Sequence, residues 1–535
     1  MNAITTNDFD KKLLEILFAY NKDLTNDLIS KNLSQTFFEI TNNSEHGDLT
    51  TNFAMMYAKS WKMQPIKLAE ILVQGFEKDK KRLFIRDIAI AGPGFINLYL
   101  DETFWHQSLN YMKSNIIEYG FEDIGKGAKV NVEYVSANPT GPLHIGHCRG
   151  AIIGDVIASL YNKMGYNVTR EYYVNDAGGQ IEQLANSVES KYKERASIKS
   201  NIQDITYNGQ YIEDIADKLF AEFHSSLLDK ANYDVIIKEY AINHILDLIK
   251  HDLDKVNIKH DVFFSESSLL ESDEIFKTIE YLKSKNYIYW GKLPLPKNQQ
   301  EINLEEREQD LFASTRFGDD IDRAVSKGDG SHTYFASDIA YHRNKLSRGY
   351  SKLINIWGAD HAGYVKRLQG AVSALSDGQA HVEVILCQLV KLFRDNKPVK
   401  MSKRNNDYIT IGQVVSEVGP DPVRFMMLYR KSDAPLDFDF VKVCDKSKEN
   451  PVFYVQYAYA RIHSVIRNWG DEMKRDFISD FNNLETDFNM LIHPYEVSLI
   501  KKMSHFPVLL KNVVVTNDVH RIAYYLHELA SDFHA

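Results

Sequence analysis

The sequence has little cysteine and no apolar run long enough to cross a membrane. Only three cysteines occur among its 535 residues, at Cys148, Cys387 and Cys444, and their spacing fits neither a disulfide framework nor a zinc site. The segment Met1–Tyr20 mixes charged and apolar residues, unlike a secretory signal. We therefore expect a cytoplasmic protein with no protein-bound metal and no membrane contact.

An excess of positive charge is also missing. The formal net charge is −10, which argues against a protein covered in basic surface, although a local basic stripe could still hold a polyanion. Hydrophobic residues make up 44% and charged residues 25% of the chain, which excludes a disordered or collagen-like protein. A chain of this length predicts roughly three or four domains.

The first hundred or so residues predict an α+β domain. Apolar residues follow helical spacing over Lys11–Tyr20, and Pro65 opens a second helical pattern. The alternation from Ile96 to Leu100 predicts a half-buried strand. We place this domain at residues 1–110.

The next segment has the order of elements that opens a nucleotide-binding α/β unit. Lys129–Val135 predicts a strand, a turn rich in proline and glycine follows, and Arg149–Met164 predicts a helix. We expect a Rossmann-like domain over residues 125–440. Charged residues with helical periodicity predict a helical insertion at about residues 182–260 within it.

Further along, the pattern returns to α/β and then becomes helical. Leu353–Trp357 and Val382–Val390 each predict a strand. From about Lys446 onward one helical pattern follows another. We therefore place an all-α domain at residues 446–535.

The sharpest chemical signal is the turn SANPTGPLHIGH at Ser136–His147, between the predicted strand and helix. The start of a helix offers unpaired backbone N–H groups, so His144 and His147 beside it could donate hydrogen bonds to triphosphate oxygens. Gly146 would let a flat base approach the backbone. The alternative is a tight turn with two solvent-facing histidines.

The second signal is KMSKR at Lys400–Arg404. Cleaving ATP between its α and β phosphates places negative charge on the departing pyrophosphate, and Lys400 and Lys403 could stabilise the charge that develops in the transition state. The alternative is a solvated basic loop.

Together the two motifs resemble the HIGH and KMSKS signatures of class I aminoacyl-tRNA synthetases, whose catalytic domain is Rossmann-like. Several longer segments resemble the arginyl-tRNA synthetases in particular. They are Glu133–Asp155, Tyr172–Ile181, Gly328–His342, Ile356–Leu368 and Asn450–Ile462. This resemblance implies a multidomain fold with an N-terminal α+β domain that contacts tRNA, a class I catalytic domain and a C-terminal helical anticodon-binding domain. The family's last domain normally extends beyond the position of Ala535, so we expect this one to lack its C-terminal end.

The resemblance also implies which residues bind arginine. A guanidinium group presents a planar fork of donors that carboxylates satisfy best. Tyr334 and Asp338 match the positions that bind this group, Glu266 is expected as a second carboxylate, and Glu133 and Asn138 match positions that hold the substrate near the HIGH turn. The residues alone allow other roles, namely a helix cap or core tyrosine for the first pair and a cap for Glu266.

The ATP site implied by the resemblance is completed by Gly146, Met401 and Ser402. Asp360 and His361 follow a predicted strand, where nucleotide sites form in α/β sheets, and either contact adenosine or have a structural role. Magnesium is expected to accompany ATP and to screen its phosphates.

The implied activity is that of an arginine–tRNA ligase. L-Arginine attacks the α-phosphate of ATP to form arginyl-adenylate, and the 2′-hydroxyl of the terminal adenosine of tRNA(Arg) then takes the arginyl group. Members of the family generally need bound tRNA before they activate arginine. We expect a monomer.

Contacts with tRNA are expected from the opening helix of the last domain and from one basic run. Gln456, Tyr457 and Arg461 could stack on or pair with anticodon bases, with ordinary helix packing as the alternative for Tyr457. The run RNKLSRGYSK at Arg343–Lys352 could meet phosphates of the acceptor arm, or it could be a solvated surface.

Two other classes of protein share part of this pattern. A small-molecule nucleotidylyltransferase could carry the HIGH-type turn, but it would not need the flanking modules or the helical C-terminal domain. A nonenzymatic RNA-binding paralogue could keep the fold, but it would be expected to lose the histidines and lysines of the ATP site.

Overall fold

A computed structural model gives the fold, and it describes residues 6–31, 37–41, 44–200, 202, 205–292, 308–399, 409–473, 481 and 487–535. The chain forms two compact units. One unit contains residues 1–122 together with 446–535, and the other contains residues 123–445. The Rossmann-like domain predicted at 125–440 lies within the second unit, while the three domain limits themselves stay predictions.

The second unit is built on a parallel sheet of the doubly wound type. Its strands run in the order β12-β11-β5-β6-β7, every neighbouring pair is parallel, and the order changes direction at β5. This arrangement confirms the predicted Rossmann-like class. The strands are β5 (Lys129–Glu133), β6 (Asn167–Val174), β7 (Val262–Ser265), β11 (Lys352–Gly358) and β12 (His381–Cys387).

The first strand ends two residues earlier than the sequence predicts. Val135 and Ser136 have φ angles of 72° and 40°, in the left-handed region that a strand cannot contain and that a β-branched valine rarely adopts. The chain therefore turns sharply after Glu133. Strain of this kind is concentrated at functional sites.

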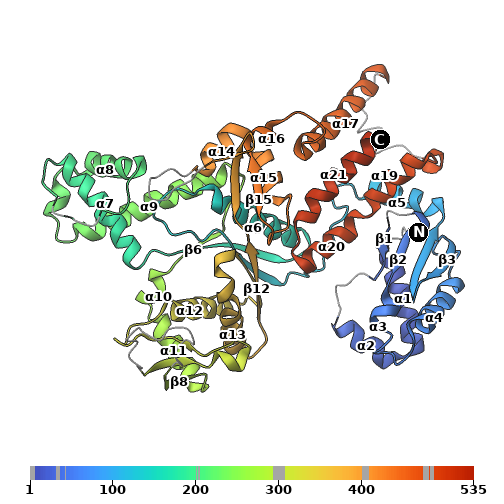
Figure 1. Ribbon diagram of the computed structural model, residues 1–535, viewed down its shortest axis with the longest axis horizontal. Helices are drawn as coiled ribbons and strands as arrows, with labels where there is room; N and C mark the ends of the chain where they lie inside the picture. The colour runs from blue at the N-terminus through green and yellow to red at the C-terminus, as the bar shows by residue number, and fades with distance from the viewer. Residues whose placement is uncertain are drawn as a thin grey trace. The chain divides into compact units, whose positions relative to one another are not determined.

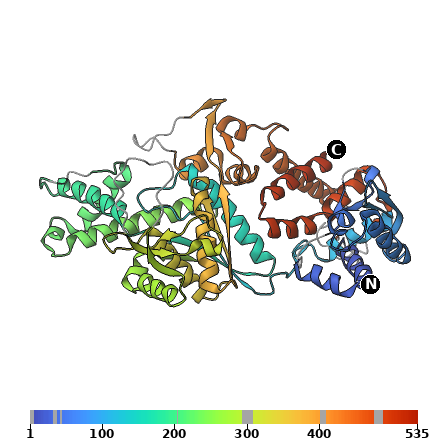
Figure 2. The same ribbon diagram turned by 60° about the horizontal axis from the view of Figure 1, so that its bottom comes forward.

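Helices pack around the sheet, and one group of them projects away from it. Figures 1 and 2 show the segment α7–α9 extending from the body of this unit, and α7 packs on both α8 and α9. These helices account for the helical character predicted at about 182–260. The helices up to the second motif are α6 (Ile145–Lys163), α7 (Gly179–Arg195), α8 (Gln210–Phe223), α9 (Tyr233–Asp254), α10 (Ser267–Glu271), α11 (Glu274–Ser284), α12 (Tyr334–Ser347) and α13 (Val365–Ser376).

Two small sheets complete the second unit. One is antiparallel and consists of β8 (Ile288–Gly291), β9 (Gln309–Phe312) and β10 (Arg323–Ala324). The other has the order β14-β13-β15. Short helices lie between β14 and β15 along the chain, and another follows β15. Its elements are β13 (Val390–Arg394), β14 (Lys397–Pro398), α14 (Ile411–Val418), α15 (Pro420–Leu428), β15 (Leu436–Asp439) and α16 (Phe440–Cys444).

The single strand predicted at Val382–Val390 is wrong, because the chain forms two strands in two different sheets. At the break, Gln388 N–H donates to the Ser432 carbonyl at 2.8 Å and Leu389 accepts from the N–H of Leu436 at 3.2 Å. These contacts pull the chain out of the parallel sheet and into pairing with β15. The new strand then turns back at Asp395 and Asn396, whose positive φ angles suit a tight hairpin.

The first unit contains an antiparallel sheet in the order β1-β2-β4-β3. Ile96, Leu98 and Leu100 on β4 are all buried, which confirms the predicted strand, and Pro65 is the first residue of α4 as predicted. The strands and helices are β1 (Glu39–Ile40), β2 (Leu49–Thr51), β3 (Ile85–Ala91), β4 (Phe95–Leu100), α1 (Thr6–Tyr20), α2 (Lys22–Lys31), α3 (Phe53–Tyr57), α4 (Pro65–Lys78) and α5 (Glu102–Ser114).

The end of the chain is helical, as predicted, and packs within the same unit. Lys501 forms an ion pair with Asp48 and lies over the Trp105 ring, which joins α19 to the N-terminal α+β segment. The helices are α17 (Pro451–Met473), α19 (Pro494–Ser504), α20 (Phe506–Thr516) and α21 (His520–His534).

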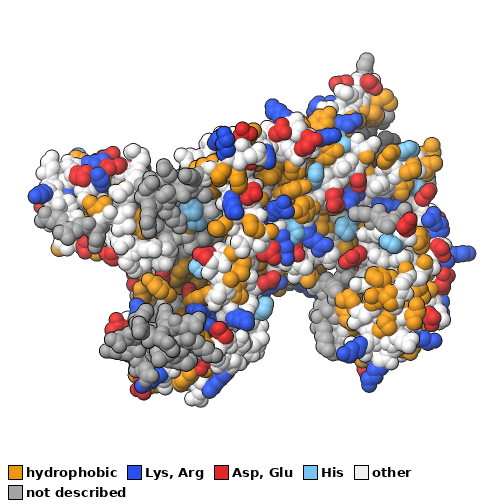
Figure 3. All heavy atoms as spheres, in the orientation of Figure 1, with side chains coloured by type: hydrophobic (Ala, Val, Ile, Leu, Met, Phe, Trp, Pro, Cys, Tyr) orange, Lys and Arg blue, Asp and Glu red, His pale blue; other side chains and the backbone are white. Residues whose placement is uncertain are grey.

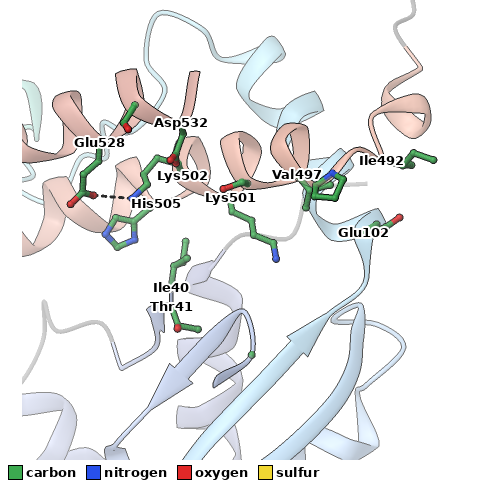
Figure 4. A pocket seen from close by; sticks show the side chains of 14 residues that line it. Ile40, Thr41, Glu102, Ile492, Val497, Lys501, Lys502, His505, Glu528 and Asp532 are labelled. Carbon is green, nitrogen blue, oxygen red and sulfur yellow. Dashed lines mark hydrogen bonds and ion pairs between the residues drawn. The ribbon is translucent and has the colours of Figure 1, made fainter. Parts of the chain in front are cut away.

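A cavity of about 700 Å³ lies in the first unit and has a lining of mixed charge (Figure 4). Lys502 Nζ pairs with Glu528 Oε2 at 2.8 Å, and Asp532 and Lys501 also face the cavity. Burial lowers the pKa of His505 to about 4, so this ring is neutral at physiological pH. Opposite charges therefore offset one another in this lining.

Candidate active site

The SANPTGPLHIGH turn joins β5 to α6 at the point where the strand order reverses. Ligands of doubly wound sheets bind at this point, beyond the carboxyl ends of the strands. His144 is the N-cap of α6, and its Nδ1 accepts from Gly146 N–H at 3.1 Å. His147 Nδ1 accepts from His144 N–H at 3.3 Å, and the two rings stack with centroids 3.9 Å apart.

These hydrogen bonds determine which ring nitrogen carries the proton. Because each Nδ1 accepts from a backbone N–H, the neutral rings of His144 and His147 hold their proton on Nε2, which becomes the donor. Both residues are partly exposed, and their rings stack on each other instead of extending separately into solvent. The rings can present N–H donors beside the positive end of a helix, the arrangement that suits phosphate oxygens.

Gly146 leaves an exposed stretch of backbone between the two histidines. A Cβ atom at this position would lie 2.8 Å from Cε1 and 2.9 Å from Nδ1 of His144. Any larger residue would therefore displace the His144 ring. The absence of a side chain maintains the stacked pair and keeps the backbone open to a flat ligand.

The KMSKR motif lies outside the described residues, so Lys400, Met401, Ser402 and Lys403 have no structural account. The residues that follow it pair with the HIGH turn. Ile145 N–H donates to the Ile409 carbonyl at 3.2 Å, and Ile411 N–H donates to the Leu143 carbonyl at 3.1 Å. Two segments about 260 residues apart in the sequence are therefore joined next to the motifs.

Arg149 fastens the HIGH helix to the segments around β13 and β15. It is 1% exposed, and its guanidinium donates to four backbone carbonyls. The acceptors are the carbonyls of Gln388 (3.1 Å), Arg430 (3.2 Å), Lys431 (2.8 Å) and Ala434 (2.7 Å). A buried cation held in this way fixes the base of the β13–β14 hairpin, which Figure 2 shows extending from the sheet.

Three carboxylates form an acidic cluster close to the same edge of the sheet. Glu133 ends β5, Glu266 follows β7, and Asp338 lies on the first turns of α12. The pKa of Asp338 is raised to about 7, mainly by burial and also by the negative charges of Glu133 and Glu266, while the Tyr364 hydroxyl and Lys345 lower it. The pKa of Glu266 is also raised, mainly by burial and then by Asp176. A cation entering this acidic cluster would relieve the repulsion.

Two tyrosines that the sequence did not single out complete the acidic cluster. The Tyr364 hydroxyl donates to Asp338 Oδ2. Burial raises the pKa of Tyr173, and Glu266, Asp338 and Glu133 raise it further, so its hydroxyl stays protonated as a donor. Tyr173 lies near the carboxyl end of β6, a position that the sequence pattern could have indicated, whereas Tyr364 is the last residue of a short 3₁₀ helix after β11.

The structure bears on the alternative roles of Glu266, Tyr334 and Asp338. Glu266 is 6% exposed and occupies the N-cap position of α10, but its side chain makes no capping hydrogen bond to that helix. Thr333, rather than Tyr334 or Asp338, caps α12. Tyr334 begins that helix but is 74% exposed, so it is not a core tyrosine.

Glu133 and Asn138 already have partners from the protein. Glu133 Oε2 accepts from Lys345 Nζ at 2.6 Å, and its Oε1 accepts from Ser136 Oγ at 3.2 Å. Asn138 is exposed and donates to Gln180 Oε1 at 2.8 Å. The Glu133 carboxylate is therefore held in place, whereas the Asn138 amide lies on the solvent-exposed side of the site.

Asp360 and His361 lie in the short 3₁₀ helix Ala359–Tyr364 that follows β11. Both are exposed, with side-chain exposures of 82% and 63%, and Asp360 Oδ2 is 3.7 Å from His361 Nε2. Their position at the carboxyl end of a central strand fits a nucleotide-contacting role. The nucleotide-contacting role of Asp360 and His361 stays a prediction.

The predicted tRNA-contacting residues lie on α17. Gln456 and Arg461 are exposed, and Tyr457 is 49% exposed. Tyr457 also stacks on His534 with ring centroids 5.2 Å apart, and Arg461 lies 3.3 Å from the same ring. Tyr457 thus combines helix packing with an accessible face.

The basic run at Arg343–Lys352 is partly internal, which neither interpretation predicted. The Lys345 side chain is fully buried against Glu133. Arg348 donates to Glu171, which is itself 0% exposed, at 2.5 and 2.8 Å. Two of the cations in this run therefore pair with internal carboxylates.

Surface charge does not identify a ligand. Basic and acidic side chains are interspersed over the face in Figure 3.

Within the described residues, no group of three or more His, Cys, Asp or Glu side chains could hold a metal ion. No helix in the described part of the chain is long and apolar enough to cross a membrane.

Comparison with known families gives three matches along the chain. Residues 13–100 match the arginyl tRNA synthetase N terminal domain, residues 115–357 match the catalytic domain of class I tRNA synthetases (R), and residues 455–535 match the DALR anticodon binding domain. The matches follow the order in which the sequence resemblance placed these parts.

Individual proteins agree with the family matches. The chain is 46% identical to the arginine–tRNA ligase of Brucella anthropi over 99% of this chain and 90% of that protein. It is 47% identical to the arginine–tRNA ligase of Bartonella henselae over 98% of this chain and 90% of that protein. The arginyl-tRNA synthetase structure of Thermus thermophilus matches with a TM-score of 0.69 at 16% identity, covering 99% of this chain and 91% of that one, which shows a shared fold.

Proposed function

The chain belongs to the arginyl-tRNA synthetases, and we therefore propose which of its residues carry out the ATP-dependent joining of arginine to tRNA(Arg). The acidic cluster of Glu133, Glu266 and Asp338 binds L-arginine, with Tyr334 and Asn138 contributing at its open side. His144, His147, Lys400 and Lys403 bind and activate ATP. The observation that carries this proposal is the position of the acidic cluster beside the HIGH turn, at the end of β5.

Arginine and ATP would then meet at the carboxyl edge of the sheet. The Nε2–H groups of the two histidines donate to phosphate oxygens, and the motif lysines stabilise the charge that develops on pyrophosphate. Gly146, Asp360, His361, Met401 and Ser402 contact or shape the adenosine site. Magnesium arrives with ATP and screens its phosphates.

The tRNA contacts are assigned to the helical end of the chain. Gln456, Tyr457 and Arg461 on α17 present exposed polar, aromatic and basic groups, which suit unstacked anticodon bases. We also propose that the enzyme acts as a monomer in the cytoplasm. Size-exclusion chromatography with light scattering tests the first point, and a higher mass than 61.6 kDa would contradict it.

The assay that tests the function is charging of total tRNA with each labelled amino acid in turn. We expect incorporation of arginine alone, dependent on ATP. Charging of another amino acid would contradict the assignment of the acidic cluster. Binding of tRNA without turnover would instead indicate a paralogue that has lost catalysis.

Replacing Gly146 with alanine is expected to slow arginyl-adenylate formation by about 10- to 100-fold, because the new Cβ would displace the His144 ring. Gly150→Ala is the matched control, since a Cβ there meets only Ile356 at an ordinary 3.7 Å. The measurement is arginine-dependent ATP–pyrophosphate exchange with tRNA(Arg) present. Equal rates for the two variants would show that the ring position does not matter.

The pH dependence of arginine use should follow Asp338. Its pKa is raised to about 7, so the carboxyl is largely protonated at pH 6 and ionised at pH 8. Because the guanidinium cation binds the ionised form, kcat/KM for arginine should rise by about tenfold between these values. A profile that is flat from pH 6 to 8 would contradict the prediction.

A further inference from the structure

Helix α12 faces the sheet with polar side chains at positions where a helix covering a parallel sheet normally carries apolar ones. His342 is 2% exposed and contacts Asn355 of β11 at 3.3 Å. Tyr341 donates to Glu171 of β6 at 2.6 Å, and Arg348 binds the same carboxylate. Lys345 reaches Glu133 of β5.

The pair between Lys345 and Glu133 is the part of this network that reaches the substrate site. Lys345 is fully buried, its Nζ lies 2.6 Å from Glu133 Oε2, and it also sits 4.4 Å from the centre of the Tyr341 ring. Burying two charges carries a desolvation cost that often cancels the attraction, and apolar residues of similar size commonly replace such pairs without loss of stability. Stability alone therefore does not explain the pair.

The pair acts on Asp338 through charge. Glu133 raises the pKa of Asp338, as Glu266 does, whereas Lys345 lowers it. The groups that face Asp338 come from every element around it. They are Glu133 from β5, Tyr173 from β6, Glu266 after β7, Tyr364 after β11, and Lys345 from α12 itself.

We propose that Lys345 is a positioning residue for arginine recognition, which holds Glu133 in a neutral pair and so leaves Asp338 and Glu266 to meet the guanidinium charge. This inference rests on the proposed arginine site. Without Lys345, three negative carboxylates would face one cation, and Asp338 would take up a proton more readily. With Lys345 present, the net negative charge of the acidic cluster is closer in magnitude to the single positive charge of the guanidinium.

Opposite changes to the pair should shift the pH profile of kcat/KM for arginine in opposite directions. Lys345→Met leaves Glu133 unpaired, so the midpoint should rise by about one pH unit. Glu133→Gln leaves the Lys345 cation beside Asp338, so the midpoint should fall. The double variant E133Q/K345M removes both charges and should return the midpoint close to its original value.

The matched control is Arg348→Met, which breaks the neighbouring ion pair between Arg348, the residue that follows α12, and Glu171 of β6. It should reduce thermal stability. It should leave the pH midpoint in place, because it keeps the groups that act on the pKa of Asp338, namely Glu133, Glu266, Tyr364 and Lys345. Equal midpoints for Lys345→Met, Glu133→Gln and the unsubstituted chain would overturn the inference. A profile that Asp338→Asn leaves unchanged would overturn the arginine site itself, which separates the two failures.

Discussion

Replacing Asp338 with asparagine is expected to raise KM for arginine by about 100-fold or more, which is the largest effect that any substitution in the acidic cluster should have. Removing one charge from a buried, hydrogen-bonded ion pair costs about 2–5 kcal/mol. Asparagine keeps the shape of the side chain and can still accept from the Tyr364 hydroxyl. The change therefore removes the charge without removing the structure. The measurement is ATP–pyrophosphate exchange as a function of arginine concentration, with tRNA(Arg) present.

Asp377→Asn supplies the control for this experiment. Asp377 is an exposed carboxylate that pairs with Lys285 and has a φ angle of 51°, which asparagine tolerates. KM for ATP should stay unchanged in both variants. If Asp338→Asn raised KM for arginine no more than Asp377→Asn did, the guanidinium would have to bind elsewhere.

The sequence predicted the parts of this site whose signals are local. The sequence placed the HIGH turn between a strand and a helix because a strand pattern precedes it and helical spacing follows it. Helix α6 does begin at that turn. Tyr334 and Asp338 were expected one turn apart at a helix start, and α12 begins at Tyr334. Such signals depend on residues within a few positions of one another.

The parts that the sequence did not predict depend on contacts between distant segments. Lys345 belongs to a basic run that looked like solvated surface, yet its partner Glu133 lies 212 positions away. The break after Cys387 depends on hydrogen bonds from the loop before β15. Hydropathy cannot reveal a buried cation whose partner comes from another element, because each residue by itself resembles an exposed one.

The acidic cluster shows how these two kinds of information combine. The sequence supplied Glu133, Glu266 and Asp338 through family resemblance, but neither periodicity nor composition could show that their charges affect one another. The fold brings the end of β5, the segment after β7 and the start of α12 together, and burial together with the neighbouring carboxylates then raises the pKa of Asp338. The chemistry of the site is therefore a property of the sheet topology.

Replacing Lys403 with alanine is expected to slow arginyl-adenylate formation by about 100- to 1000-fold, with KM for arginine unchanged. The lysine is proposed to stabilise charge on departing pyrophosphate, which exists only in the transition state of the first step. Transfer from preformed arginyl-adenylate to tRNA(Arg) releases no pyrophosphate, so its single-turnover rate should be preserved. This difference separates a catalytic role from general damage to the enzyme.

Lys397→Ala is the matched control for Lys403→Ala, because Lys397 is an exposed lysine on β14 in the same basic stretch. If KMSKR were only a solvated basic loop, the two substitutions would reduce pyrophosphate exchange equally. The structure favours a specific role, because Ile409 and Ile411 after the motif bond to Ile145 and Leu143 of the HIGH turn. A solvated loop without a specific role would gain nothing from being joined to the residues that are proposed to bind ATP. Loss of exchange in Lys403→Ala alone would therefore assign a specific role in this step to the KMSKR motif.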